Sequence, residues 1–387
     1  MSLTKLWASA PEDLETKHIK QVIAFAGNGR LIDQNPASME FRNYLSLIPA
    51  SLLTRYANEC LNLKDKFEES GFALQDIINE VGKRLGFEVQ NGRYRGVQNQ
   101  PGDDGLWLSK DKYRLLIEVK TTDVYRIDLN NIASYRLRRI NDKEFSAEQS
   151  SVLIVVGRND TGDLEAQIRG SKHAWDVRLI SVEALLRLMK IKEDVEDPNI
   201  IRKVANILTP REYTKLDSII DLVFSTAEDI SDEVFEEPEH DSKKQKFIPV
   251  SFHDACVIRI SRFLKKKIVK QTRSTYTTAD GAAGLVCAIS RLHDSYGKNL
   301  YWYAFHPHQR EFLLKTKDSY VAFGCGSEKK IILIPFKVFS PWLDKMNTTK
   351  KADKTYYWHV FIFENENKLE LHLKKGNDYI DLNKFLI

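Results

Sequence analysis

Two carboxylates and a lysine lie close enough in this sequence to form a metal-dependent catalytic site. Asp104 precedes a Gly-Leu-Trp segment, and Glu118 and Lys120 end an apolar run. If this run is a β-strand, its side chains alternate, so Glu118 and Lys120 share one face while their neighbours point into the core. Two carboxylates and an ammonium then meet at a strand edge. That arrangement suits a hard divalent cation beside a negatively charged substrate.

Phosphodiester hydrolysis is the reaction that these residue types favour. The reaction needs an activated water and neutralised charge on the phosphate and on the leaving oxygen. We expect Asp104 and Glu118 to bind Mg²⁺, for which Mn²⁺ can substitute. Lys120 would orient or deprotonate the water, or stabilise the developing charge. A Glu-x-Lys sequence alone also occurs by chance on solvated strands, so the prediction depends on the Asp-Gly turn and the apolar run before it.

The elements expected around these residues resemble one known group of enzymes. The pattern predicts a helix, three strands, a second helix and a further strand, over residues 72–85, 87–89, 106–108, 113–120, 127–140 and 151–157. This αβββαβ order, together with Asp104 and the Glu118–Lys120 sequence, is similar to the PD-(D/E)xK nuclease superfamily. The resemblance covers roughly residues 71–180. It implies an α/β restriction-endonuclease-like core with a mixed sheet, and a metal-dependent nuclease activity.

The sequence departs from the superfamily's Pro-Asp pair at one point. Here Pro101 is followed by Gly102, Asp103 and Asp104, so two aspartates compete for the metal. We expect Asp104 to be the ligand because it begins the hairpin that leads to Glu118, which makes Asp103 a turn residue. The opposite assignment stays open.

Many members of this superfamily take a further carboxylate from the first helix. Glu80 fits that place, because it lies beside the apolar stripe of the predicted helix, and Asp76 lies one turn earlier on the same side. The resemblance therefore adds Glu80 to the candidate catalytic residues. The alternative, for both acids, is an ordinary solvated helix face.

The length and the charge pattern predict several domains. The chain has 387 residues, more than most single domains have, and 42% of them are hydrophobic. Residues 1–70 show helical periodicity and are expected to cap the nuclease domain, residues 71–225, or to form a dimer surface. Residues 226–246 are rich in Asp and Glu and indicate a linker. Residues 247–387 are expected to form a separate α+β domain.

The C-terminal part carries a basic excess that favours DNA binding. From Lys243 onward there are 26 Lys and Arg against 13 Asp and Glu, whereas the preceding residues hold 32 against 41. A basic module joined to an acidic catalytic domain is typical of a nucleic-acid enzyme, although lysines also serve solubility alone. The expected DNA-binding residues are Arg93 and Arg95 in a glycine-bounded loop of the nuclease domain, and Lys265, Lys266, Lys267, Lys270 and Arg273 beside a polar loop at 274–281.

Aromatic residues are concentrated in the predicted strands of the C-terminal part. Tyr301, Trp302, Tyr303, Tyr357 and Trp358 belong to this group. They could form a stacking or flipped-base pocket, but aromatic residues in strands more often pack in the core or across strands. The sequence leaves both interpretations open.

The cysteines and the hydropathy indicate the compartment in which the protein is expected. The four cysteines are too scattered for a zinc cluster or a disulfide framework, which favours a reducing cytoplasm. No apolar run reaches the roughly 18 residues that a membrane helix needs. The first residues also lack the layout of a secretory signal. We expect a cytoplasmic protein without membrane partners.

The resulting prediction is a Mg²⁺-dependent endonuclease that cleaves double-stranded DNA and resembles restriction endonucleases. The resemblance implies a role in restriction or phage defence. One active site per chain cuts one strand, so we expect a homodimer, at least on DNA. Alternatives are a nuclease of repair or of RNA, a defence nuclease gated by a ligand or a modified base, and a non-catalytic DNA-binding protein on a nuclease scaffold.

Overall fold

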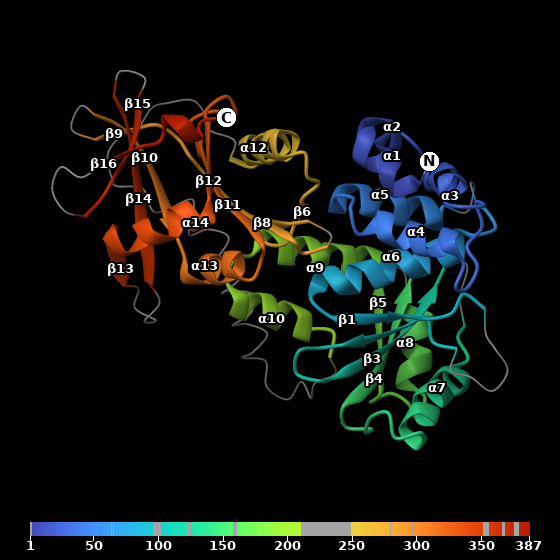
Figure 1. Cartoon of the computed structure of the whole chain (residues 1–387). Helices are drawn as coiled ribbons and strands as arrows, with labels where there is room; N and C mark the ends of the chain where they lie inside the picture. Colours follow the sequence, from blue (N-terminus) through green and yellow to red (C-terminus); the bar gives the residue numbers. More distant parts are fainter. Residues whose placement is uncertain are drawn as a thin grey trace. The chain divides into compact units, whose positions relative to one another are not determined.

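The computed structural model describes residues 2–62, 64, 66–95, 102–121, 126–157, 161–209, 249–278, 280–295, 298–350, 356–365, 368–374 and 379–387. The chain divides into two compact units, Met1–Glu233 and Val234–Ile387, called here the N-terminal and C-terminal units (Figure 1). The division falls within the predicted acidic linker at 226–246, which lies outside the described residues. The predicted regions 1–70 and 71–225 belong to the same compact unit.

The N-terminal unit begins with helices and continues as a mixture of strands and helices. Its helices are α1 (Leu3–Ser9), α2 (Pro11–Glu15), α3 (Ile19–Phe25), α4 (Pro36–Leu45), α5 (Ala50–Leu61), α6 (Ser70–Leu85), α7 (Leu129–Asn141), α8 (Gly162–Arg169), α9 (Val182–Asp194) and α10 (Pro198–Asn206). Its strands are β1 (Glu88–Asn91), β2 (Gly105–Leu108), β3 (Arg114–Lys120), β4 (Ser150–Val156) and β5 (Val177–Ser181). The helical character predicted for the first 70 residues agrees with helices α1–α5.

A mixed five-stranded sheet in the order β1-β2-β3-β4-β5 forms the centre of this unit. The strands β1, β2 and β3 are joined antiparallel, whereas β4 runs parallel to β3 and β5 runs parallel to β4. Parallel neighbours require crossover connections, and the chain between β3 and β4 contains α7. Strand β4 is buried along its whole length, as expected for a central strand that is covered on both faces.

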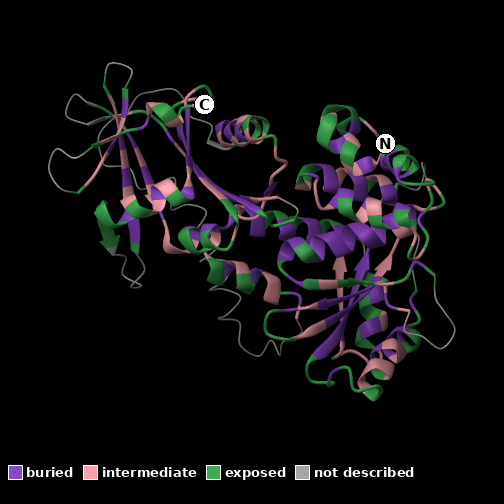
Figure 2. Ribbon diagram, in the orientation of Figure 1, coloured by how far each residue is buried: buried purple, intermediate pink, exposed green. Residues whose placement is uncertain are grey.

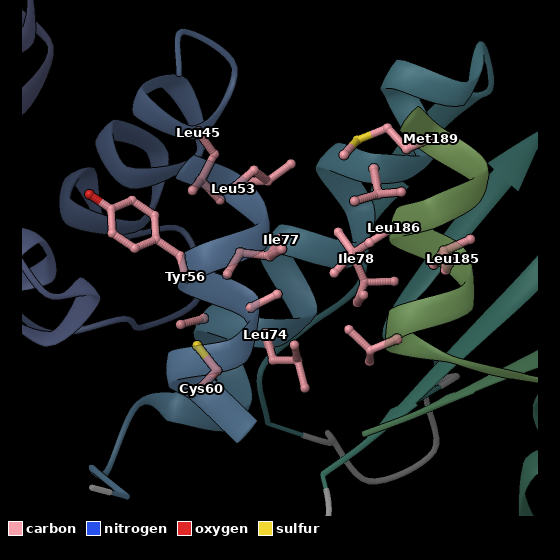
Figure 3. Packing of buried hydrophobic residues seen from close by; sticks show 14 of the residues in the cluster. Leu45, Leu53, Tyr56, Cys60, Leu74, Ile77, Ile78, Leu185, Leu186 and Met189 are labelled. Atoms are coloured by element: carbon pink, nitrogen blue, oxygen red, sulfur yellow. The ribbon is translucent and has the colours of Figure 1, made fainter. Parts of the chain in front are cut away.

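Helix α6 lies between two layers and is buried almost all around. It ends at Gly86, whose φ of 99° is a left-handed conformation that glycine adopts without strain. Leu74, Ile77 and Ile78 pack between α5 and α9, as Figure 3 shows. In Figure 2 the ribbon of this helix is mostly purple, the colour of buried residues. A helix buried on all sides contacts different partners with each face, and this decides the roles of its polar residues.

The opposite face of the sheet is covered by α7 and α8. Leu116, Val152 and Ile154 from the strands pack there with Ile132 and Leu164 from these helices. Leu116, Glu118 and Lys120 are alternate residues of β3, so their side chains lie on the same face of the sheet. Glu118 and Lys120 lie at the C-terminal end of the strand. The sheet therefore positions the predicted catalytic residues on the α7 side.

The C-terminal unit consists of two sheets and several short helices. Its helices are α12 (Pro249–Leu264), α13 (Pro307–Leu314), α14 (Phe336–Phe339) and the 3₁₀ segments η2 (Ser340–Lys345) and η3 (Asn383–Phe385). Its strands are β6 (Val269–Lys270), β7 (Thr275–Thr277), β8 (Ala283–Ser290), β9 (His293–Ser295), β10 (Lys298–Phe305), β11 (Asp318–Cys325), β12 (Ile331–Pro335), β13 (Thr348–Lys350), β14 (Tyr356–Asn365), β15 (Lys368–His372) and β16 (Tyr379–Asp381).

The two sheets pack face to face around an apolar core. One has the order β12-β11-β8-β7-β6, and the other has the order β16-β15-β14-β10-β9, with β13 also paired to β14. Tyr303 and Val360 from the second sheet meet Val321 and Ile334 from the first sheet in this core. Helix α12 covers the other face of the first sheet, where Cys256 packs against Leu285. The predicted polar loop at 274–281 is partly wrong, because β7 occupies its first half and pairs with β8.

Among the described residues, no helix combines the length and the apolar character that crossing a membrane requires.

Candidate active site

Asp104 lies directly before β2, and Glu118 lies on β3, the antiparallel partner of β2. The pairing of the two strands begins at Gly105 and Ile117, which are the chain neighbours of Asp104 and Glu118. The Asp104 backbone N–H donates to the Ile117 carbonyl at 2.9 Å, and its Oδ2 accepts a hydrogen bond from the Val119 N–H at 2.7 Å. The Asp104 carboxylate is therefore held against the Glu118–Lys120 end of β3, and the Glu118 carboxylate raises the pKa of Asp104, as expected for two carboxylates near each other.

The backbone that carries Asp104 is held from helix α6. The Asp104 carbonyl accepts hydrogen bonds from Gln75 Nε2 at 3.0 Å and from Asn79 Nδ2 at 2.9 Å. The N–H of Gly92 donates to the same carbonyl at 3.0 Å. Because these donors come from a buried helix and from the end of β1, the position of Asp104 is fixed by the fold and does not depend on a flexible turn. A site held in this way can keep its geometry before substrate binds.

Gly105 permits this contact because it has no side chain. A Cβ at Gly105 would lie 2.2 Å from Asn79 Oδ1, which accepts a hydrogen bond from Trp107 Nε1 at 2.9 Å. The short distance means that an added methyl group would displace Asn79, Gly105 or both.

We therefore expect Gly105→Ala to reduce cleavage at least about tenfold without removing any catalytic group, because it shifts the backbone beside Asp104. Nuclease rates and thermal unfolding of the two proteins would measure this effect. The matched control is Gly71→Ala, since a Cβ at Gly71 would have no atom within 4 Å. Equal cleavage rates for wild type and Gly105→Ala would show that the Asn79 contact does not position Asp104.

The two carboxylates are placed where burial and like charge disfavour ionisation. Burial raises the pKa of Asp104 to about 7, with the nearby Glu118 carboxylate adding to the effect and the Val119 N–H opposing it. Burial also raises the pKa of Glu118, although Lys120 acts in the opposite direction. Glu118 Oε2 is buried and has no hydrogen-bond partner among the described residues. A cation between the two carboxylates would offset both the cost of burying their charges and the repulsion between them.

Lys120 contacts Glu118 and is held in its charged form. Its Nζ donates to Glu118 Oε1, and its side chain is half-buried. Burial lowers the pKa of Lys120, but the carboxylates of Glu118 and Asp104 outweigh burial and raise it overall. An ammonium with a raised pKa is a poor proton acceptor at neutral pH. Of the roles left open by the sequence, charge stabilisation and positioning of the water fit this environment better than proton abstraction.

The donor set suits a hard divalent cation. Mg²⁺ binds oxygen ligands, keeps several of its waters, and is commonly held by one or two carboxylates. Asp104 and Glu118 supply these, and Glu118 Oε2 is an oxygen available for coordination. Within the described ranges, no group of three or more His, Cys, Asp or Glu side chains forms a metal-binding cluster. The residues therefore fit a magnesium site with two carboxylates and not a site enclosed by protein ligands.

Asp103 has a different environment from Asp104. Its carboxylate is buried, and Arg139 of α7 contacts both of its oxygens, with Nη2 at 3.0 Å from Oδ1 and 3.1 Å from Oδ2. Arg139 also bonds to Glu144 at 2.8 Å. Burial raises the pKa of Asp103, and the Arg139 guanidinium opposes this. Asp103 is thus more than the turn residue that we expected, because it attaches the Asp104 loop to α7.

Asp103→Asn should leave the affinity for Mg²⁺ within about threefold, because it changes the contact with Arg139 but removes no metal ligand. Calorimetric titration of the metal would test this, with thermal unfolding as the check that the variant is folded. Asp104→Asn serves as the comparison and should lose metal binding. Loss of metal binding in Asp103→Asn alone would transfer the ligand role to Asp103.

The structure does not bring Glu80 to the two carboxylates. Glu80 Oε1 accepts a hydrogen bond from Arg84 Nε at 3.1 Å, and Arg84 donates to the carbonyls of Leu45 and Ile48. Consecutive helix positions are rotated by about 100°, so Glu80 faces the N-terminal helices while Asn79 faces the sheet. We therefore correct the sequence-based assignment of Glu80: the helix residues that reach Asp104 are Gln75 and Asn79.

Asp76 lies on the same side of α6 as Glu80 and is fully enclosed. Arg42 Nε donates to its Oδ1 at 2.8 Å, and the Tyr94 hydroxyl donates to Oδ2 at 2.5 Å. Burial raises the pKa of Asp76 to about 6, with Arg42 and Tyr94 acting in the opposite direction. The expectation of a solvated helix face is wrong for this residue. Asp76 joins α4, α6 and the segment that follows β1.

Tyr94 anchors the segment that carries the predicted DNA-binding residues Arg93 and Arg95. Its ring is buried, and its backbone N–H donates to Asp33 Oδ1 at 2.8 Å. Arg93 and Arg95 on either side are exposed. The two arginines are thus held at the surface of the N-terminal unit, where phosphate contacts are sterically possible.

Tyr135 of α7 is a neighbour of the site that reasoning from the sequence missed. Its hydroxyl accepts a hydrogen bond from Asn131 Nδ2 at 2.9 Å, and it contributes to the electrostatic environment of Lys120. A Cβ at Gly102 would lie 3.0 Å from this hydroxyl. The spacing of four residues between Asn131 and Tyr135 on the predicted helix is the available signal, since it places both on one face.

The predicted basic residues of the C-terminal unit differ in exposure and in their partners. Lys265 is exposed and has a φ of 52°, whereas Lys266 Nζ lies 2.6 Å from Asp318 Oδ2. Lys267, Lys270 and Arg273 are half-buried. The adjoining Ser274 and Thr275, the first residues of the predicted polar loop, are buried, so these two side chains are not exposed to a nucleic acid.

No family model matches this chain, and a search of curated proteins found no match either.

Proposed function

We propose that this protein is a Mg²⁺-dependent endonuclease that hydrolyses phosphodiester bonds of double-stranded DNA. The observation that carries the proposal is the position of the Asp104 carboxylate at the Glu118–Lys120 end of β3, where it accepts a hydrogen bond from the Val119 N–H and where Lys120 contacts Glu118. Burial raises the pKa values of both carboxylates, their mutual repulsion adds to the effect at Asp104, and one buried Glu118 oxygen has no partner among the described residues. An arrangement that is unfavourable without a cation is expected where binding a cation is the function.

The surrounding elements support a restriction-endonuclease-like core. The chain order is α6, β1, β2, β3, α7 and β4, which is the αβββαβ order of the PD-(D/E)xK superfamily that the sequence resembles. The sheet is antiparallel from β1 to β3 and parallel from β3 to β4. In this arrangement Asp104 directly precedes the second strand and the Glu118–Lys120 segment ends the third, which supports the proposed resemblance.

Each residue has a distinct task in the proposed reaction. Asp104 and Glu118 would hold Mg²⁺ through their carboxylate oxygens, and Gln75 and Asn79 keep Asp104 in place. When bound, the metal would lower the pKa of a coordinated water and neutralise charge on the phosphate. Lys120, as an ammonium, would position the attacking water or stabilise the negative charge that develops on the phosphoryl oxygens.

The C-terminal unit is proposed to contribute DNA affinity through its basic excess. The sequence from Lys243 onward has 26 basic and 13 acidic residues, and electrostatic attraction to phosphates is largely independent of base sequence. Each chain carries one Asp104–Glu118 site, so cutting both strands requires a homodimer or two successive nicks. We propose the homodimer, formed at least on DNA. Sedimentation that shows a strict monomer on cleavable DNA would contradict it.

The direct test is incubation of the purified chain with plasmid and phage DNA, methylated and unmethylated, in Mg²⁺, Mn²⁺ or EDTA. We expect cleavage with either metal and none with EDTA. Cleavage that persists in EDTA would exclude the metal mechanism. Binding without cleavage on every substrate would favour a non-catalytic DNA-binding protein. Cleavage restricted to modified DNA would instead indicate a nuclease gated by a modified base.

A further inference from the structure

The outer face of the sheet β16-β15-β14-β10-β9 carries a set of aromatic rings that are separate from the core. Strand alternation divides the aromatic residues of β10 and β14 into two groups. Tyr301, Tyr303 and Trp358 point inward and are buried in the core between the sheets. On the other side lie Trp302 of β10 and His359, Phe361 and Phe363 of β14, with His372 of the neighbouring strand β15; these five are half-buried, whereas Tyr357 on the same side is buried. We call the five half-buried residues the aromatic face.

The strand register places these rings in adjoining rows. Trp302 of β10 pairs with Phe361 of β14, which pairs in turn with His372 of β15. Directly paired residues on antiparallel strands share a face and lie close together. The rings of His359 and Phe361 are stacked with their centroids 5.4 Å apart, and those of Phe363 and His372 are 4.2 Å apart. The result is an extended surface of rings across three strands.

Hydrogen bonds fix the central rings of this surface. Trp302 Nε1 donates to His359 Nδ1 at 3.0 Å, and His359 Nε2 lies 2.7 Å from the Thr349 hydroxyl. Accepting the indole N–H requires a neutral imidazole, and burial lowers the pKa of His359, which favours that form. Rings that are already oriented lose little conformational freedom when a ligand binds.

The aromatic face does not serve the packing of the described core. Trp302, Phe361 and Phe363 belong to none of the apolar clusters of the described residues. Helices α12, α13 and α14 contact mainly β8, β11 and β12. These strands belong to the other sheet, which packs against the face opposite to the aromatic face (Figure 1). A contiguous patch of large aromatic residues that stays partly accessible indicates an interaction or ligand-binding site more than scattered exposed rings do.

The chemistry of this face fits unpaired nucleobases. The five side chains are aromatic or imidazole rings, and every nucleobase can stack on such a ring. Lys345 and Lys374 are exposed, and the Lys374 N–H bonds to the Lys345 carbonyl at 2.7 Å, near the end of β15 that follows His372. These two ammonium groups supply charge that complements phosphates. Glu370 pairs with Phe363, farther from this end of β15, so the phosphate backbone is expected near the lysines.

We propose that the aromatic face binds a single-stranded segment of nucleic acid, by stacking unpaired bases on Trp302 and Phe361 while Lys345 and Lys374 contact phosphates. A duplex cannot supply this contact, because its bases are stacked on each other. The inference rests on the proposed function only in taking nucleic acid as the ligand. It adds that the C-terminal unit holds an unpaired strand, whether it arises at an end, in a gap or by local opening.

The test uses the full-length chain in EDTA, so that binding is measured without cleavage. An oligo-dT of about 15 nucleotides, within the site sizes of single-strand-binding folds, is compared with an abasic deoxyribose-phosphate strand of the same length, which has the phosphates but no bases. We expect oligo-dT to bind at least about tenfold more tightly than the abasic strand and to quench tryptophan fluorescence. This comparison needs no variant. Equal affinity for the two strands would overturn the proposal.

Variants locate the binding to the aromatic face. Trp302→Ala and Phe361→Ala should each weaken oligo-dT binding about tenfold, whereas Trp302→Phe should retain most of it because a ring is kept. The matched control is Phe263→Ala, which removes an aromatic ring of α12 that is 60% exposed. Unchanged affinity in folded Trp302→Ala and Phe361→Ala proteins would refute the assignment.

A different occupant would give a different result. If the aromatic face docks a second copy of the chain, oligo-dT would not bind selectively, and Trp302→Ala would convert a dimer to a monomer in sedimentation; that outcome overturns the proposal. Failure of the nuclease proposal is distinguishable, because it is decided by Mg²⁺-dependent cleavage and its need for Asp104. Base-dependent binding in EDTA is independent of that result.

Discussion

Asp104→Asn is expected to lower DNA cleavage by at least about a thousandfold while the protein remains folded and binds DNA. The substitution removes a charged oxygen ligand, and metal-ion stabilisation of the transition state is worth several kcal/mol, with each factor of ten in rate corresponding to about 1.4 kcal/mol. The hydrogen bonds from α6 that hold position 104 go to its backbone carbonyl and do not involve its carboxylate. Single-turnover cleavage in Mg²⁺, with DNA binding measured in EDTA, separates the catalytic effect from the binding effect.

The same substitution should stabilise the metal-free protein at about pH 8. The Asp104 pKa is raised from 3.8 to about 7, mainly by burial and then by Glu118. A raised carboxyl pKa means that the folded state holds its proton more tightly than the unfolded state. Stability from this group is therefore fully present below about pH 4 and is lost as the pH rises through about 7. Asn removes that loss, so the melting temperature of Asp104→Asn should exceed that of wild type at about pH 8, and the difference should vanish toward pH 4.

Addition of Mg²⁺ should reverse the order of the two melting temperatures, so that wild type melts above Asp104→Asn. The metal stabilises only the protein that can bind it, so the melting temperature of wild type should rise with Mg²⁺ while that of Asp104→Asn stays constant. Asp111→Asn is the control, because it changes an exposed carboxylate of the turn between β2 and β3. Wild-type cleavage by Asp104→Asn would show that the site is wrongly assigned. A metal-free melting temperature below that of wild type at about pH 8 would show that the carboxylate is not under electrostatic stress.

Combined replacement of Lys265, Lys267 and Lys270 by alanine should weaken DNA binding on all sequences alike. Each phosphate neutralised by a lysine releases condensed counterions, so the slope of log K against log salt should become shallower by about 0.9 for each lysine–phosphate pair removed, or up to about 3 for the triple variant. Fluorescence anisotropy of duplex DNA between roughly 50 and 200 mM salt, in EDTA, would give this slope.

Lys266→Ala provides the matched control from the same run of lysines. Its Nζ lies 2.6 Å from Asp318 Oδ2, so its charge is already compensated within the protein. We expect a change in slope well below that of Lys265→Ala, although the sequence pattern predicts the same role for both lysines. If the triple variant keeps the wild-type salt slope, the phosphate contacts lie elsewhere, and the exposed Arg93 and Arg95 become the next residues to replace.

The main elements and the residues of the candidate site could be predicted from the sequence because their signals are local. The apolar run within 113–120 and the β-branched run at 151–157 indicate β3 and β4, and an Asp-Gly turn precedes the first strand of the hairpin. A hairpin of this kind brings the ends of its two strands together, so Asp104 is expected near the Glu118 end of β3 from the pairing of Gly105 with Ile117. The aromatic residues at 301–303 are also evident in the sequence, but not which of them are buried.

Only the tertiary structure shows how the environments of two neighbouring residues differ. Asp103 and Asp104 are adjacent and chemically identical, and what separates them is Arg139, 36 residues further along the chain from Asp103. On α6, the rotation between Asn79 and Glu80 directs one side chain to the sheet and the other to Arg84, and periodicity cannot show this because α6 is buried on both sides. Alternation predicts two faces of β10, but only the packing of the other sheet makes Tyr301 and Tyr303 core residues and leaves Trp302 outside. A local pattern shows that a strand or helix has two different faces. Long-range packing decides which residues of the fold each face contacts.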